Sequence, residues 1–188
     1  MCPDAFAPLE LDPVHKCFDT TIDAAHPLLL NSRSGVMVLR GIELEVGSGQ
    51  KGFFEVRCIK GKEEYISIGL GSFEVGLWLK GFGRLGTAYE GIGWVSCGKV
   101  LFGHGMGATD LEIRDRWLPA PRFTTGDVLG LMVDCSEAPM LLFFVNGAKM
   151  GDMVFAEEVL GKVLSPAFQL RGDSKIEISP NPDLPAGV

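Results

Sequence analysis

Two apolar runs separated by a short turn constrain this chain more than any other feature. Residues 128–133 read Val-Leu-Gly-Leu-Met-Val and residues 140–145 read Met-Leu-Leu-Phe-Phe-Val, and both runs are too short for most helices. A Ser-Glu-Ala-Pro turn at 136–139 separates them, and Asn146-Gly147, which tolerates positive φ, ends the second. Because strands that are apolar on both faces must be covered on both faces, the pair is expected to form a central hairpin in a sandwich.

Short apolar or alternating segments, separated by glycine-rich turns, continue this pattern through the chain. They occupy residues 36–39, 42–46, 53–59, 65–70, 92–95, 100–102, 164–170 and 175–178. Residues 103–122 are expected to form a loop, 171–174 a turn between two strands, and 153–160 one short helical turn. With 25 glycines and no sustained helical period, the sequence predicts an all-β, two-layer antiparallel sandwich with few or no helices.

The chain is expected to form one domain with an extension at each end, because 188 residues suit a single domain. Prolines at positions 3, 8, 13 and 27 exclude long helices from residues 1–34. This part is expected to be an arm that packs on the sandwich. The sandwich itself is expected over residues 35–182, followed by a tail at 183–188.

Composition and charge exclude several classes of function. A net charge of −7 without a run of Lys or Arg disfavours nucleic acid and favours a protein partner. The five cysteines are widely spaced and form no Cys-x-x-Cys, so neither zinc nor a disulfide framework is expected, and Cys58 and Cys135 are interpreted as buried small hydrophobes. No apolar run approaches the roughly 18 residues of a membrane helix. The acidic amino terminus lacks the apolar region of a secretory signal, so a cytoplasmic or nuclear location is expected.

Three motifs suggest ligands but have simpler explanations. Residues 93–99 have the Gly-x4-Gly-Lys spacing of a phosphate loop, but Val100 replaces the required hydroxyl and the following residues read as a strand. Residues 81–86 match Gly-x-Gly-x-x-Gly without room for the helix of a dinucleotide site. Arg171-Gly172-Asp173 spells an adhesion tripeptide, but a turn between strands explains it better. No cofactor or metal is therefore expected.

Catalysis is not predicted either. The three histidines lie far apart at positions 15, 26 and 104, and no nucleophile elbow or His-Glu-x-x-His motif is present. A hydrolase would need two carboxylates facing each other across a cleft, which sequence alone does not exclude. The chain is expected not to be an enzyme.

A glycine-rich connection carries the residues most typical of an interface. Phe82 and Leu85 are large apolar residues flanked by glycines, with Arg84 between them, and this composition is typical of interface hot spots. Trp117 is a second candidate of the same kind. The alternative for the neighbouring residues 77–79 is a buried strand.

Several segments, in order, resemble the SPRY domain family. Residues 52–57 are similar to its Gly-x-aromatic-aromatic-Glu-Val strand, and residues 126–130 and 143–147 to its Gly-Asp-Val-(Ile/Leu)-Gly and Phe-(Phe/Tyr)-x-Asn-Gly pair. Residues 67–70, 91–105 and 164–170 resemble three further segments of the family. The resemblance covers roughly residues 35–180. Ser165 stands where the family usually has an aromatic residue, and residues 176–180 depart from its final strand.

The resemblance implies a bent, concanavalin-like β-sandwich that is not catalytic and recognises a short segment of another protein through loops at one edge. Such domains occur in ubiquitin-ligase adaptors and chromatin complexes. Arg40 matches a family arginine that often faces the ligand, the loop from Phe82 to Leu85 falls at a contact loop, and Arg171-Gly172 falls in another. With Arg84, the arginines are expected to supply charge-assisted bonds. A monomer without membrane contact is expected, and a lectin-like carbohydrate-binding module is the alternative.

Overall fold

Every regular element in the described part of the chain is a β-strand, so the predicted all-β fold is confirmed. The computed structural model describes residues 10–11, 20–23, 25–40, 44–45, 47–61, 66–72, 91–103, 116–136, 138–154 and 163–179. Its strands are β1 (Glu10–Leu11), β2 (Thr20–Asp23), β3 (His26–Arg40), β4 (Leu44–Glu45), β5 (Lys51–Lys60), β6 (Ile66–Ser72), β7 (Gly91–Val95), β8 (Lys99–Gly103), β9 (Arg116–Pro119), β10 (Val128–Asp134), β11 (Met140–Val145), β12 (Ala148–Val154) and β13 (Val163–Ile178).

Four strands were not predicted from the sequence, and two of them, β1 and β2, lie in the expected arm. Strand β9 lies within the stretch expected to be a loop, and β12 follows the Asn146-Gly147 turn directly. Met153 and Val154 belong to β12 and not to a helical turn, while residues 155–160 lie outside the described residues. Conversely, residues 93–99 form strand, turn and strand, as predicted in place of a phosphate loop.

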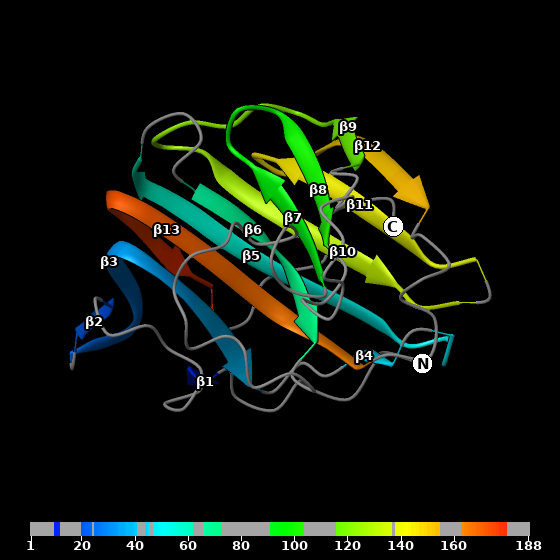
Figure 1. The fold of residues 1–188 in the computed structure, drawn as a ribbon, viewed down its shortest axis with the longest axis horizontal. Helices are drawn as coiled ribbons and strands as arrows, with labels where there is room; N and C mark the ends of the chain where they lie inside the picture. Colours follow the sequence, from blue (N-terminus) through cyan, green and yellow to red (C-terminus); the bar gives the residue numbers. More distant parts are fainter. Residues whose placement is uncertain are drawn as a thin grey trace, which may run out of the picture.

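Two layers of strands are joined by two long strands, β3 and β13. The described order is β12-β11-β10-β5-β13-β6-β7-β8-β9, so we call β5 with β10–β12 the β10 layer and β6–β9 the β6 layer. Strand β13 pairs with β6 from Leu164 to Leu170 and then with β5 from Lys175 to Ile178, while β3 pairs with both parts of β13. Figure 1 shows β3 (blue) and β13 (orange) side by side, and the green β7 and β8 crossing over β10 and β11.

Strand β13 changes layers at a bulge formed by Arg171–Ser174. Its register with β3 shifts between these two residues, and Gly172 (φ 60°) and Asp173 (φ 59°) lie in the left-handed region that Gly and Asp tolerate best. The Ser174 hydroxyl donates a hydrogen bond to the Arg171 carbonyl oxygen. This segment is therefore a bulge within one strand, and the predicted turn between two strands is wrong, because β3 pairs on both sides of it.

Strand β3 also crosses the position expected to separate the arm from the sandwich. Ser34 lies opposite Arg171 and Gly35 opposite Leu170, so pairing with β13 is continuous there. The domain limits at 34/35 and 182/183 stay predictions.

The space between the layers is filled by one apolar core. Trp94 of β7 is 1% exposed, and its ring lies 5.1 Å from that of Phe143 of β11, which belongs to the other layer. Phe54 of β5 and Phe168 of β13 make a second edge-to-face contact at 5.8 Å. Such contacts confirm that the two layers pack face to face as a sandwich.

The hairpin of β10 and β11 is buried on both faces, as its sequence predicted. Leu129, Leu131 and Val133 point into the core between the layers, and the alternate face carries a second cluster of buried side chains. That cluster consists of Phe53, Met132, Leu142 and Phe144. Because β10 pairs with β5 on one side and β11 with β12 on the other, the hairpin is central in its layer.

Gly130 of β10 leaves the space that the second cluster needs. A Cβ at this position would lie 2.8 Å from Cε2 of Phe53 and 3.1 Å from Cβ of Phe144, and these rings already pack edge to face at 6.0 Å. We expect Gly130→Ala to lower the free energy of unfolding by about 1–3 kcal/mol, because an overpacked site must displace its neighbours. Urea unfolding followed by circular dichroism measures the change.

Gly151 of β12 provides a matched control in the same layer. A Cβ there meets no atom within 4 Å, so Gly151→Ala should change stability by no more than about 0.5 kcal/mol. Equal losses for the two variants would contradict the close packing of Phe53 and Phe144 over Gly130.

Candidate functional site

A row of paired residues with small side chains at its centre crosses the strands of the β6 layer. The row joins Trp117, Leu101, Gly93, Gly69, Ala167 and Val38, each opposite the next on the adjoining strand. The neighbouring row, Trp94, Ile68 and Phe168, is buried in the core between the layers. Since successive residues of a strand face opposite sides, Gly93, Gly69 and Ala167 lie on the side of the layer that faces away from this core. Glycines within strands often mark places where another backbone approaches closely.

Polar side chains lie on both sides of this row. Ser67 and Gln169 are paired across β6 and β13, and Ser165 lies opposite Gly71. All three side chains are buried, and the hydroxyl groups of Ser67 and Ser165 have no hydrogen-bond partner among the residues that the structure describes. A buried hydroxyl without a partner costs about 1–3 kcal/mol. On β6 and β13 this side of the layer is therefore small, polar and buried, unlike the apolar surfaces by which sheets stack on each other.

The residues predicted to contact a partner are spread along this sheet and do not form one compact cluster. Trp117 occupies the row on β9, and Arg171 lies at the bulge of β13 opposite Ser34. Arg40 ends β3 opposite Glu10 of β1. Ser34 is paired with Arg171, and Arg40 is six residues further along β3. The two arginines are therefore roughly 20 Å apart along the strand direction.

Phe82, Arg84 and Leu85 lie outside the described residues. The strands that bound their segment end at Ser72 and begin at Gly91, and Ser72 lies opposite Leu164. Arg40 falls at this same end of the layer, because Val38 lies opposite Ala167. Arg171 and Gly172 fall at the other end, where β13 bends.

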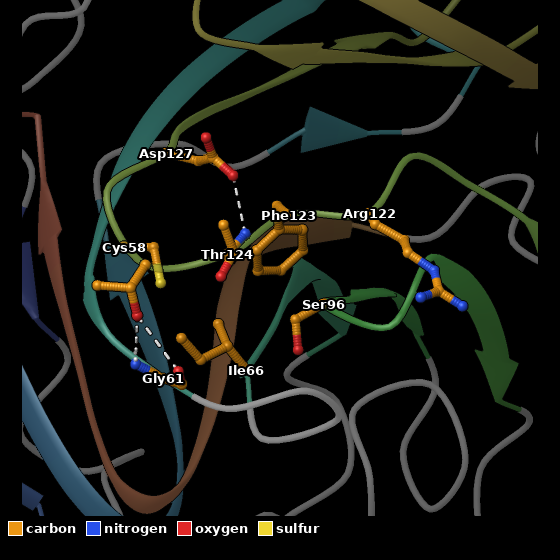
Figure 2. A pocket seen from close by; sticks show the side chains of 9 residues that line it. Cys58, Gly61, Ile66, Ser96, Arg122, Phe123, Thr124 and Asp127 are labelled. Atoms are coloured by element: carbon orange, nitrogen blue, oxygen red, sulfur yellow. Dashed lines mark hydrogen bonds between the residues drawn. The ribbon is translucent and has the colours of Figure 1, made fainter.

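A pocket of about 250 Å³ opens at the bend end of the sandwich (Figure 2). Four segments far apart in the sequence meet there: the end of β5, the start of β6, the β7–β8 turn, and the segment before β10. Its lining consists of Cys58, Gly61, Ile66, Ser96, Arg122, Phe123, Thr124, Thr125 and Asp127. Sequence reasoning did not predict this pocket.

The wall of the pocket is held by hydrogen bonds around Asp127. One carboxylate oxygen accepts the backbone N–H of Thr124 at 2.8 Å, and the other accepts Nδ2 of Asn146 at 3.0 Å. The amide oxygen of Asn146 accepts the backbone N–H of Val128 at 2.9 Å. The Gly-Asp and Asn-Gly segments that carry the family resemblance are thus in direct contact, and they join the β10 strand to the turn after β11.

The thiol in this pocket is not suited to nucleophilic chemistry. Burial, together with the negative charge of Asp127, raises the pKa of the Cys58 thiol to about 11, while a hydrogen bond with Thr125 lowers it by less. A thiol with that pKa is protonated at neutral pH, and only the thiolate is a strong nucleophile. Cys58 is therefore not activated as a nucleophile in this pocket.

No group of three or more potential metal ligands is found in the part of the chain that the structure describes. In the same part, no helix has the length and apolar character needed to span a membrane.

No protein-family model matches this sequence, and no curated protein matches it. Solved structures, in contrast, match nearly the whole chain. The SPRY domain of human HERC1 aligns with a TM-score of 0.64 at 17% identity, covering 90% of this chain and 97% of that one. The TRIM65 PSpry domain aligns with a TM-score of 0.64 at 12% identity (92% and 90% covered), and a human SPRY domain with 0.59 at 15% identity (88% and 98%).

The two layers and the long strands that join them define a bent β-sandwich. Its fold is that of SPRY domains, and the predicted resemblance is confirmed at this level.

Proposed function

We propose that this chain is a non-catalytic protein-interaction domain that recognises a short segment of a partner protein, as an adaptor or subunit of a larger complex of the ubiquitin-ligase or chromatin type. The observation that carries the proposal is the placement of Arg40, Trp117 and Arg171 on three strands, β3, β9 and β13, of one continuous sheet. A rigid scaffold of this kind loses little conformational entropy on binding, which favours affinity.

The spacing of the two arginines defines the size of the recognised segment. Positions roughly 20 Å apart along β3 match about six residues of extended peptide. Arg40 and Arg171 would bind carboxylates or carbonyl oxygens near its two ends by charge-assisted hydrogen bonds. Trp117 on β9, with Phe82, Arg84 and Leu85, would supply further apolar and basic contacts, while Gly172 allows the bulge that presents Arg171.

The double variant Phe82→Ala/Arg171→Ala tests this assignment, and Met150→Ala is the control. Met150 is 55% exposed on β12, in the other layer. Partners are recovered by affinity purification from native cells and quantified by mass spectrometry. We expect the double variant to recover each specific partner in an amount at least fivefold lower than the unaltered chain does, and the control to recover the same amount as the unaltered chain. Circular dichroism verifies that both variants are folded.

Two outcomes would contradict the proposal. An unchanged set of partners would overturn the site, and specific binding to a glycan array without protein partners would favour the lectin-like alternative. The same purification tests a cytoplasmic or nuclear location, and light scattering tests a monomeric state.

A further inference from the structure

The pocket at the bend end combines an apolar floor with one carboxylate at its rim. Cys58, Ile66 and Phe123 form the floor, and Figure 2 shows their side chains grouped between the segments that bound the pocket. Cys58, Ile66 and Phe123 are all less than 5% exposed. A methylene chain that enters here meets apolar atoms on several sides, which favours its transfer from water.

The carboxylate of Asp127 is held by neutral hydrogen-bond donors of the described residues. These are the backbone N–H of Thr124 and the amide group of Asn146. Each oxygen retains acceptor capacity beyond these bonds. After burial itself, the charge of Asp127 is the second cause that raises the pKa of the Cys58 thiol, so its field extends to the floor of the pocket.

Arg122 also lines this pocket, and its positive charge would repel a cation bound there. The guanidinium group of Arg122 points away from Asp127 in Figure 2. Because Arg122 is exposed, solvent screens its repulsion of a cation at Asp127. Each carboxylate oxygen of Asp127 already accepts one hydrogen bond. The remaining acceptor positions suit the compact ammonium group of a lysine better than the planar guanidinium group of an arginine, which binds both oxygens of a carboxylate at once.

We infer that this pocket receives the side chain of a lysine, with its methylene chain over Ile66 and Phe123 and its ammonium group at Asp127. The inference rests on the proposed function, since the lysine belongs to the partner protein. It adds a second contact point at the bend end, next to the Arg171 bulge: Leu170 lies opposite Ile66, and Lys175 lies opposite Lys60. A net charge of −7 on the domain favours such a basic residue in the partner.

The test uses two small probes, N-acetyl-lysine methylamide and the neutral N-acetyl-norleucine methylamide, titrated into the ¹⁵N-labelled full chain. We expect the lysine probe to shift the amide signals of Ile66, Ser96 and Asp127 and to bind at least fivefold more tightly than the norleucine probe. The difference should shrink between 50 mM and 500 mM salt, because the attraction to Asp127 is screened.

Two variants show whether Asp127 is responsible. Asp127→Asn should make the two probes bind equally. Thr124→Lys places an ammonium group of the chain itself at the exposed rim without removing a backbone hydrogen bond, and it should abolish binding of the lysine probe. If Asp127→Asn fails to fold, Thr124→Lys decides.

Equal binding of both probes to the unaltered chain, or no signal change with either, would overturn the lysine site. The partner purification with Phe82→Ala/Arg171→Ala is independent of these probes, so failure of the pocket and failure of the proposed function are distinguishable.

Discussion

Trp94→Ala is expected to lower the free energy of unfolding by about 4 kcal/mol, since truncation of a buried Trp costs about 3–5 kcal/mol. The indole ring contacts Phe123 at 5.0 Å and Phe143 at 5.1 Å, and thus bridges both layers and the segment before β10. Its Nε1 also donates a hydrogen bond to the Pro121 carbonyl oxygen at 2.7 Å. Because domains are stable by only about 5–15 kcal/mol, such a loss leaves a marginal fold.

Trp94→Phe separates the two contributions of this side chain. It keeps an aromatic ring in the core and removes only the indole donor and some volume, so a loss of about 1–2 kcal/mol is expected. Urea unfolding at neutral pH, followed by far-ultraviolet circular dichroism, measures both variants. Similar small losses for Ala and Phe would contradict the bridging role of Trp94.

The second large effect is a loss of stability in alkaline solution caused by two buried thiols. Burial raises the pKa of Cys58 from its ordinary value of 9.0 to about 11, with a contribution from Asp127, and burial with the charge of Asp134 raises the pKa of Cys135 to about 11. The unfolded chain releases these protons near pH 9, whereas the folded chain retains them. The protonated thiols therefore contribute stability that is fully present below pH 9 and is lost as the pH rises to about 11.

By pH 11 each thiol contributes about 2.5 kcal/mol to this loss, since one pKa unit corresponds to about 1.4 kcal/mol and the folded thiols are then half ionised. Urea unfolding at pH 8, 9, 10 and 11 in a reducing buffer should show a decline of about 5 kcal/mol. In Cys58→Ala/Cys135→Ala the decline should be smaller by about that amount. Lysine and tyrosine titrate in both proteins, so only the difference between them reports on the thiols. Parallel pH profiles would show that the thiols are not buried in the folded state.

The strands that form the core were predictable because their side chains carry the pattern of burial locally. The apolar runs at 128–133 and 140–145 became the central strands β10 and β11, and Cys58 and Cys135 are buried as predicted. The edge strands β9 and β12 were not predicted because they lack this local pattern. In the described order β9 and β12 lie at the two ends, where proline and charged residues are tolerated. Pro119 ends β9, and an ion pair of 2.7 Å joins Lys149 to Asp152 on β12.

The amino-acid sequence by itself determined the fold class, the central hairpin and the resemblance to SPRY domains, because alternation and turn residues act over a few neighbouring positions. Only the tertiary structure decided that Arg171–Ser174 is a bulge within β13, that Arg40 and Arg171 lie at opposite ends of one layer, and that Asp127 borders a pocket. These features depend on pairing with β3, β5 and β6. The register between strands so distant in the chain is set by packing of the whole core, which no local segment encodes.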